Sequence, residues 1–134
     1  MLVGDRLSPG DVNRVAWAAR QAEEACGHPF IAYIAEPGAE GSVEERAHAL
    51  HATLADRDEA VLVYVDPQHH EVVVVTGARA ARTLSDASCA LATASMVTSF
   101  AAGDLTGGIV GGIAQLGQAA RTQANMHLRP AIDR

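Results

Sequence analysis

Aromatic side chains are scarce in this chain of 134 residues. They make up 4% of it, whereas 49% of the residues are hydrophobic. The core must therefore be built from Ala, Val, Leu and Ile, with Trp17, Phe30 and Phe100 as its few large side chains. A chain of this length is typical of one domain that folds without disulfides or metal, and we expect that domain to span residues 1–124.

Clustered positive charge is also missing. The formal net charge is −6 at pH 7, and the sequence contains no run of Lys or Arg. Nucleic acids and anionic membranes attract proteins through such runs. The sequence therefore predicts no nucleic-acid partner and no membrane partner.

Cysteine motifs and long hydrophobic runs are absent as well. Cys26 and Cys89 stand far apart, which excludes a zinc knuckle or a redox pair and predicts two small buried hydrophobic residues. Residues 1–6 lack the apolar segment of a signal peptide. The weakly polar stretch 105–120 is shorter than the roughly 20 residues of a membrane span. We therefore expect a soluble, cytoplasmic chain with no membrane insertion.

The order of apolar segments and helix caps predicts an α/β fold. Helices are expected over residues 9–26, 43–54, 86–101 and 105–121, and strands over 30–35, 60–65 and 71–76. The first two strands and the helix between them form a βαβ unit, and a tight turn returns the third strand antiparallel. This predicts a three-layer sandwich: a small mixed sheet with the second helix on one face and the other helices opposite. The stretch 125–134 is expected to be a loose tail.

Four glycines interrupt the last predicted helix at Gly107, Gly108, Gly111 and Gly112. Each costs up to about 1 kcal/mol relative to Ala in a helix. Close packing against a neighbouring helix is the expected compensation, so that Gly111→Leu should overpack. The segment does not resemble a phosphate-binding loop, because it follows a helix and lacks the Lys-Ser/Thr ending.

Three local signatures support a family resemblance over residues 8–120. They are Asp58 before the strand at 61–66, Gly77 followed by Leu84-Ser85-Asp86, and the segment Phe100-Ala101-Ala102-Gly103-Asp104-Leu105-Thr106-Gly107-Gly108-Ile109. Together they resemble the TPM domain family (thylakoid acid phosphatase-like), and the Ala-rich composition resembles an actinobacterial branch of it. The resemblance implies acid phosphatase activity or calcium binding. The chain departs from the family pattern at Val75, where members carry an acid, and at Ala78, where they carry Tyr.

Two groups of carboxylates are candidate sites. Asp58 and Asp86 flank Gly77 at one end of the sheet and predict a weak calcium site, since calcium prefers oxygen ligands. The alternative is that Asp58 is a solvated loop acid and Asp86 a helix cap. Glu36, Asp66 and Asp104 gather at the opposite end, as an acidic rim of turn and cap residues without Lys or Arg.

The remaining polar residues suggest no catalytic set. The histidines are His28, His48, His51, His69, His70 and His127. They match no zinc motif and are interpreted as solvated. Ser95, Ser99 and Cys89 show no nucleophile elbow and no assigned base.

The functional prediction is a non-catalytic binding or interaction domain with an unknown protein partner and weak calcium binding. The missing family acid at Val75 and the absence of a nucleophile–base set favour it. The alternative is a metal-dependent acid phosphatase, a phosphomonoester hydrolase inherited with the fold.

Overall fold

The computed structural model describes the backbone of residues 7–128 and the side chains of residues 7–124. Its helices are α1 (Pro9–Cys26), α2 (Val43–Ala52), α3 (Asp86–Ala101) and α4 (Leu105–Leu128), and its strands are β1 (Phe30–Ile34), β2 (Val61–Asp66) and β3 (Glu71–Thr76). Two short 3-10 turns, η1 (Pro67–His69) and η2 (Ala80–Arg82), flank β3. No helix in the part of the chain described is long and apolar enough to cross a membrane.

The three strands form one mixed sheet in the order β1-β2-β3. Strand β1 runs parallel to β2, with Phe30 opposite Val61, and β3 runs antiparallel to β2, with Val75 opposite Leu62. Helix α2 makes the crossover between the parallel strands. The predicted βαβ unit with a returning hairpin strand is confirmed.

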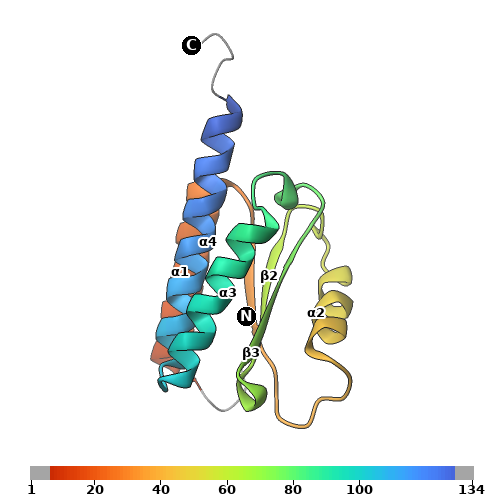
Figure 1. The fold of residues 1–134 in the computed structure, drawn as a ribbon, viewed down its shortest axis with the longest axis vertical. Coiled ribbons are helices and arrows are strands. Elements are labelled where there is room, and N and C mark those ends of the chain that lie inside the picture. Colours follow the sequence, from red (N-terminus) through yellow and green to blue (C-terminus); the bar gives the residue numbers. More distant parts are fainter. Residues whose placement is uncertain (1–6, 129–134) are drawn as a thin grey trace.

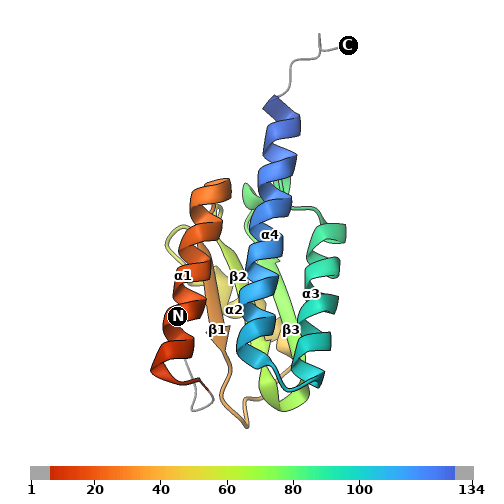
Figure 2. The same ribbon diagram turned by 90° about the vertical axis from the view of Figure 1, so that its left-hand side faces the viewer.

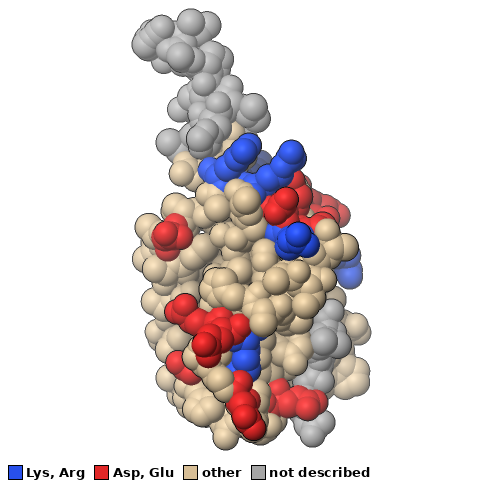
Figure 3. Space-filling model, turned by 90° about the vertical axis from the view of Figure 1, so that its right-hand side faces the viewer, with Lys and Arg blue, Asp and Glu red and all other residues tan. Residues whose placement is uncertain are grey.

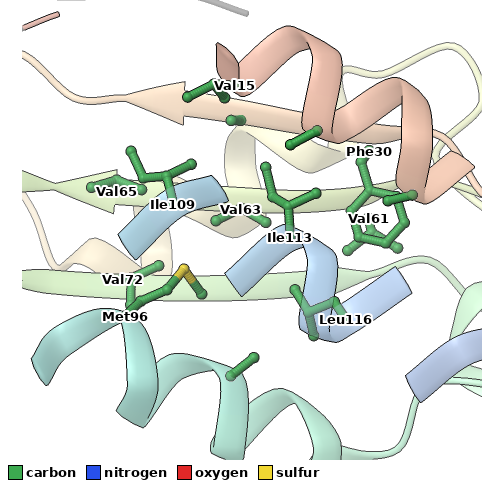
Figure 4. Packing of buried hydrophobic residues seen from close by; sticks show 14 of the residues in the cluster. Val15, Phe30, Val61, Val63, Val65, Val72, Met96, Ile109, Ile113 and Leu116 are labelled. Atoms are coloured by element: carbon green, nitrogen blue, oxygen red, sulfur yellow. The ribbon is translucent and has the colours of Figure 1, made fainter. Parts of the chain in front are cut away.

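The sheet is the middle layer of a three-layer sandwich. Helix α2 covers one face, whereas α1, α3 and α4 cover the other (Figures 1 and 2). The larger core cluster lies beneath the three helices, where Val63 and Val65 meet Ile109 and Ile113 (Figure 4). Alternation along β2 sends its other side chains into a second cluster toward α2. The predicted fold class is therefore confirmed.

Local capping explains where the helices begin. The Ser8 hydroxyl accepts a hydrogen bond from the Asp11 N–H at 3.1 Å, and the Asp104 carboxylate accepts one from the Gly107 N–H at 2.9 Å. Ser42 and Glu45 form a reciprocal capping box at the start of α2. These bonds satisfy amide groups that have no partner within the helix, so the caps predicted from sequence are confirmed.

Trp17 corrects the predicted core. Phe30 and Phe100 are buried as expected, but the Trp17 side chain is 56% exposed. Along α1 the buried positions are Val15, Ala18 and Ala22, and Trp17 lies on the outer side of this helix. Scarcity of aromatics therefore did not force every large side chain inward.

The glycines of α4 are used unequally. A side chain at Gly112 would collide with Met96, and one at Gly108 with Ser99 and Phe100, so the close packing of α4 on α3 is confirmed at these positions. Gly111, however, is exposed and faces open space. The predicted overpacking at Gly111 is wrong, because this position points away from both neighbouring helices.

Helix α4 also runs further than predicted. It continues to Leu128 instead of ending near residue 121, so part of the expected tail, residues 125–128, is helical. The rest of that tail, residues 129–134, lies outside the described residues.

Candidate functional site

Asp58 lies in the loop before β2, where its backbone is tightly held. Its carbonyl oxygen accepts hydrogen bonds from the Arg79 and Ala80 N–H groups at 2.8 and 3.3 Å. A side chain at Gly77 would strike the backbone of Arg57 and Asp58, which explains the glycine. The Asp58 carboxylate is exposed and lines an open hollow of about 360 Å³ together with Asp56, Glu59, Arg57 and Arg79. The two guanidinium groups offset part, but not all, of the negative charge that a cation requires.

Asp86 lies in the first turn of α3 and is exposed. Ser85 is the residue that caps the helix, because its hydroxyl accepts from the Ser88 N–H at 3.1 Å. Within the described residues, neither Asp58 nor Asp86 belongs to a group of three converging metal-binding side chains. The calcium site at Asp58 and Asp86 stays a prediction.

A polar cluster that sequence reasoning missed lies at the same end of the sheet. Arg79 donates to Glu59 at 3.1 Å, and the other Glu59 oxygen lies 3.4 Å from His28 Nδ1. The opposite ring nitrogen of His28 bonds the Thr83 hydroxyl at 2.9 Å. Since these residues come from three separate segments, before β1, before β2 and after β3, no sequence spacing indicated the cluster. It joins the loop before β2 to the segment after β3.

Asp66 at the opposite end of the sheet is buried and satisfied. Its side chain is 5% exposed and accepts from Arg46 and from the His69 ring, each at 3.0 Å. Burial alone would raise the pKa of Asp66, but hydrogen bonds from His69 and Arg46 lower it below its usual range. Arg46 also donates to the Tyr64 hydroxyl at 3.0 Å.

This pairing corrects the predicted all-acidic rim. Sequence order places Glu36, Asp66 and Asp104 near the strand ends, yet Arg46 from α2 supplies a positive charge that strand order could not reveal. Figure 3, which views the molecule from the α2 side, shows basic side chains among acidic ones in both the upper and the lower part of this face.

Asp66, His69 and Glu71 form the one potential metal-binding group within the described residues, with ligand atoms within 4.8 Å of one another. The Asp66 oxygen nearest His69 is also the one that binds Arg46. A cation there would have to displace a guanidinium from a buried carboxylate. The arrangement is better explained as a structural tie between α2 and the turn after β2.

Two histidines correct the interpretation that all are solvated. His51 is buried in α2, and its ring bonds the Ala60 carbonyl at 3.1 Å. His28 is largely buried in the cluster described above. His48, His69 and His70 are exposed, as predicted. The side chain of His127 lies outside those described.

Neither cysteine is an activated nucleophile. Burial raises the pKa of both the Cys26 and the Cys89 thiol, and Asp86 raises that of Cys89 further. A catalytic thiol needs the opposite shift.

Val75, where the resembled family carries an acid, is buried beside Leu62 in the core that faces α2. Val75 therefore serves the packing of this core.

The exposed Trp17 marks a further candidate surface. It lines an open hollow of about 510 Å³ with Asn13, Arg14 and Arg20 of α1 and Val110 of α4. Among the residues that the structure describes, the one ion pair of Arg14 is a long contact to Asp11, at 3.8 Å. Sequence reasoning missed this surface because it assigned Trp17 to the core.

These features define a small three-layer α/β sandwich with one aromatic, arginine-flanked hollow on its helical layer. The chain belongs to the family described as "Domain of unknown function (DUF5130)", whose model matches residues 8–117. Among curated proteins, none matches the sequence.

Two solved structures share the fold. The BA42 protein from the psychrophilic bacterium Bizionia argentinensis has a TM-score of 0.76 at 22% identity, covering 90% of this chain and 86% of that one. The N-terminal domain of the cg2496 protein from Corynebacterium glutamicum has a TM-score of 0.66 at 10% identity, covering 89% and 77%. At these identities the likeness concerns the fold alone. None of these matches links the chain to the TPM family, so that resemblance stays a prediction.

Proposed function

We propose that this chain is a non-catalytic interaction module that binds a partner protein on α1 around Trp17. The observation that carries the proposal is the exposure of Trp17, at 56%, in a hollow flanked by Arg14 and Arg20. Trp and Arg are the residue types that most often dominate binding energy in protein interfaces. Covering the exposed indole removes a large apolar surface from water, which contributes favourably to the free energy of binding.

The charges of the hollow indicate the chemistry of the partner. The whole chain carries a net charge of −6, yet Arg14 and Arg20 place two positive groups beside the indole. A partner segment with an apolar side chain for Trp17 and carboxylates for the arginines is complementary to this surface. The partner segment can contact this surface without any rearrangement of the core, because Trp17 lies outside the core.

Site-specific photo-crosslinking in cells tests this proposal. Benzoylphenylalanine is introduced at Asn13, which lines the hollow beside Trp17, or, as a control, at Leu91 of α3, which is 66% exposed. We expect a crosslinked partner from position 13 that is absent from position 91 and is lost in an Arg14→Ala/Arg20→Ala background. Identical products from both positions, or none from either, contradict the proposal.

Weak calcium binding at Asp58 and Asp86 is a secondary element of the proposed function. Its support is that both carboxylates are exposed and that the Asp58 backbone is bonded to Arg79 and Ala80, in the segment that leads into α3. The metal-dependent phosphatase has support only from the TPM resemblance. Both are tested below.

A further inference from the structure

The hollow around Trp17 lies where α1 and α4 run next to each other. Trp17 lines it from α1 and Val110 from α4. Further along the two helices, a side chain at Gly117 would strike Ala22, so they are in close contact there. Figure 2 shows α1 and α4 side by side on the outside of the sandwich, with no other described element over them. The hollow is therefore accessible to a partner that approaches the helical layer from outside.

The α1 side of the hollow carries a regular row of side chains. Arg14, Trp17 and Arg20 follow one another at intervals of three residues, and all three are exposed. Residues at this spacing form an inclined ridge on a helix surface, and each step advances about 4.5 Å along the axis. Among the described residues that line the hollow, none is acidic. The ridge therefore presents an aromatic ring between two positive charges.

The α4 side of the hollow is low. Val110 is half-buried, and the exposed positions that follow it are Gly111 and Ala114. A side chain added at Gly111 would meet no atom within 4 Å. A high ridge on α1 thus stands beside small residues on α4, and side chains of a third helix can pack against such a step.

Backbone hydrogen bonding favours a helix as the occupant. The peptide groups inside α1 and α4 are already bonded within each helix, so the hollow offers side chains alone. The sheet edge at β1 offers no alternative, because Phe30, Ala32 and Ile34 are at most 7% exposed. An extended segment binds mainly through main-chain hydrogen bonds to a sheet edge, whereas a helix satisfies its own backbone and binds through its side chains.

We propose that the partner segment is an acidic amphipathic helix, which packs along the Arg14–Trp17–Arg20 ridge over Val110. This inference rests on the proposed function of the Trp17 surface and specifies its ligand. The helix carries an apolar residue for Trp17 and Val110, with a carboxylate three or four residues to either side for the two arginines. A row of residues four apart advances about 6 Å per step and packs beside a ridge of residues three apart at a crossing angle of about 20°.

The test begins with a selection of random peptides displayed on phage against the full chain. Peptides of about 18 residues can form about five helical turns. A selected peptide, labelled with fluorescein, is titrated with the wild type, Trp17→Ala and Ala114→Arg, which places a long side chain on the α4 side of the hollow. Ala94→Arg, at an exposed alanine of α3, is the matched control. Circular dichroism melts check that each variant is folded.

We expect the selected peptides to share an acid, an apolar residue and an acid at intervals of three or four residues, and to gain helical circular dichroism when bound. Trp17→Ala and Ala114→Arg should each weaken binding by about tenfold or more, as at a binding hot spot, and Ala94→Arg should leave it unchanged. Arg14→Glu/Arg20→Glu should abolish binding, and a peptide with lysines in place of its acids should restore it.

The outcomes separate this inference from the proposed function beneath it. A selected peptide that loses affinity with Trp17→Ala but tolerates a central proline overturns the helical partner and leaves the Trp17 surface as a binding site. Selection of no peptide also overturns the helical partner, and binding that is indifferent to Trp17→Ala counts against both proposals. Self-association of the chain that Trp17→Ala abolishes would make a second copy the occupant instead. Crosslinking from position 13 tests the surface alone.

Discussion

The guanidinium of Arg46 lies 3.0 Å from the buried carboxylate of Asp66 and joins α2 to the carboxyl end of β2. The two residues are 20 positions apart, and the hydrogen bond fixes α2 to the sheet at this end. His69 binds the same carboxylate from the turn that follows the strand. Three segments are therefore fixed by one side chain.

Replacing Arg46 by Met should destabilise the fold. The change leaves the buried Asp66 with the His69 ring as its remaining side-chain partner, and we expect a loss of about 1–3 kcal/mol in the free energy of unfolding. Urea denaturation measures it. The control is Arg14→Met, which removes an exposed contact to Asp11 at 3.8 Å and should change stability by less than about 0.5 kcal/mol. Equal changes in the free energy of unfolding for the two variants would show that the Arg46–Asp66 pair stabilises the fold no more than an exposed contact does.

Asp66 should make stability depend on pH in acid. Its pKa is lowered in the folded state, so its contribution is complete above the unfolded value near 3.9 and is lost as pH falls through the lower folded value. Unfolding free energies of the wild type and Asp66→Asn should therefore differ at neutral pH and converge in acid. A difference that is constant from pH 7 to pH 2 contradicts this assignment.

Adjacent glycines of α4 should respond in opposite directions to alanine. Gly112→Ala places a methyl group against the fully buried Met96 and should cost about 1–3 kcal/mol by overpacking. Gly111→Ala adds a methyl group in open space and should stabilise by up to about 1 kcal/mol through helix propensity. Thermal melts measure both. The same sign for the two changes would mean that α4 packs differently.

The calcium prediction is tested by titrating calcium into labelled protein and following amide chemical shifts. A site at Asp58 and Asp86 should move the amides around both residues, and an Asp58→Asn/Asp86→Asn variant should remove the response. Shifts that are the same in the variant, or absent in the wild type, eliminate this site. Arg57 and Arg79 beside Asp58 lead us to expect weak binding at most.

The phosphatase alternative needs a separate assay. Hydrolysis of a chromogenic phosphomonoester is measured with and without calcium or magnesium, and compared with an Asp58→Ala/Asp86→Ala variant. As a non-catalytic module, the chain should give rates equal to buffer. Metal-dependent turnover that the double variant abolishes would establish the enzyme instead.

Regular patterns made much of the fold predictable. Several features depend only on neighbours within a few residues. They are the apolar runs of β1 and β2, the helix caps at Ser8, Ser42 and Asp104, and the turn at Asp66. Such local signals are written in the sequence itself. The parallel pairing then followed from the helix between the two strands.

The candidate surfaces were less predictable, since they depend on which side of an element a residue occupies. Composition placed Trp17 in the core, but the angular position of Val15, Ala18 and Ala22 on α1 turned it outward. Strand order placed acids at one end of the sheet, yet Arg46 reaches from α2 and pairs with Asp66 there.

By itself the sequence determined the elements, their order and the α/β class, because hydrophobic period and capping act over short distances. Only the tertiary structure decided that Gly112 packs while Gly111 does not, that Asp66 has a buried partner, and that Trp17 lies outside the core. These depend on contacts between segments far apart in the chain, and the three-dimensional packing of the layers sets them.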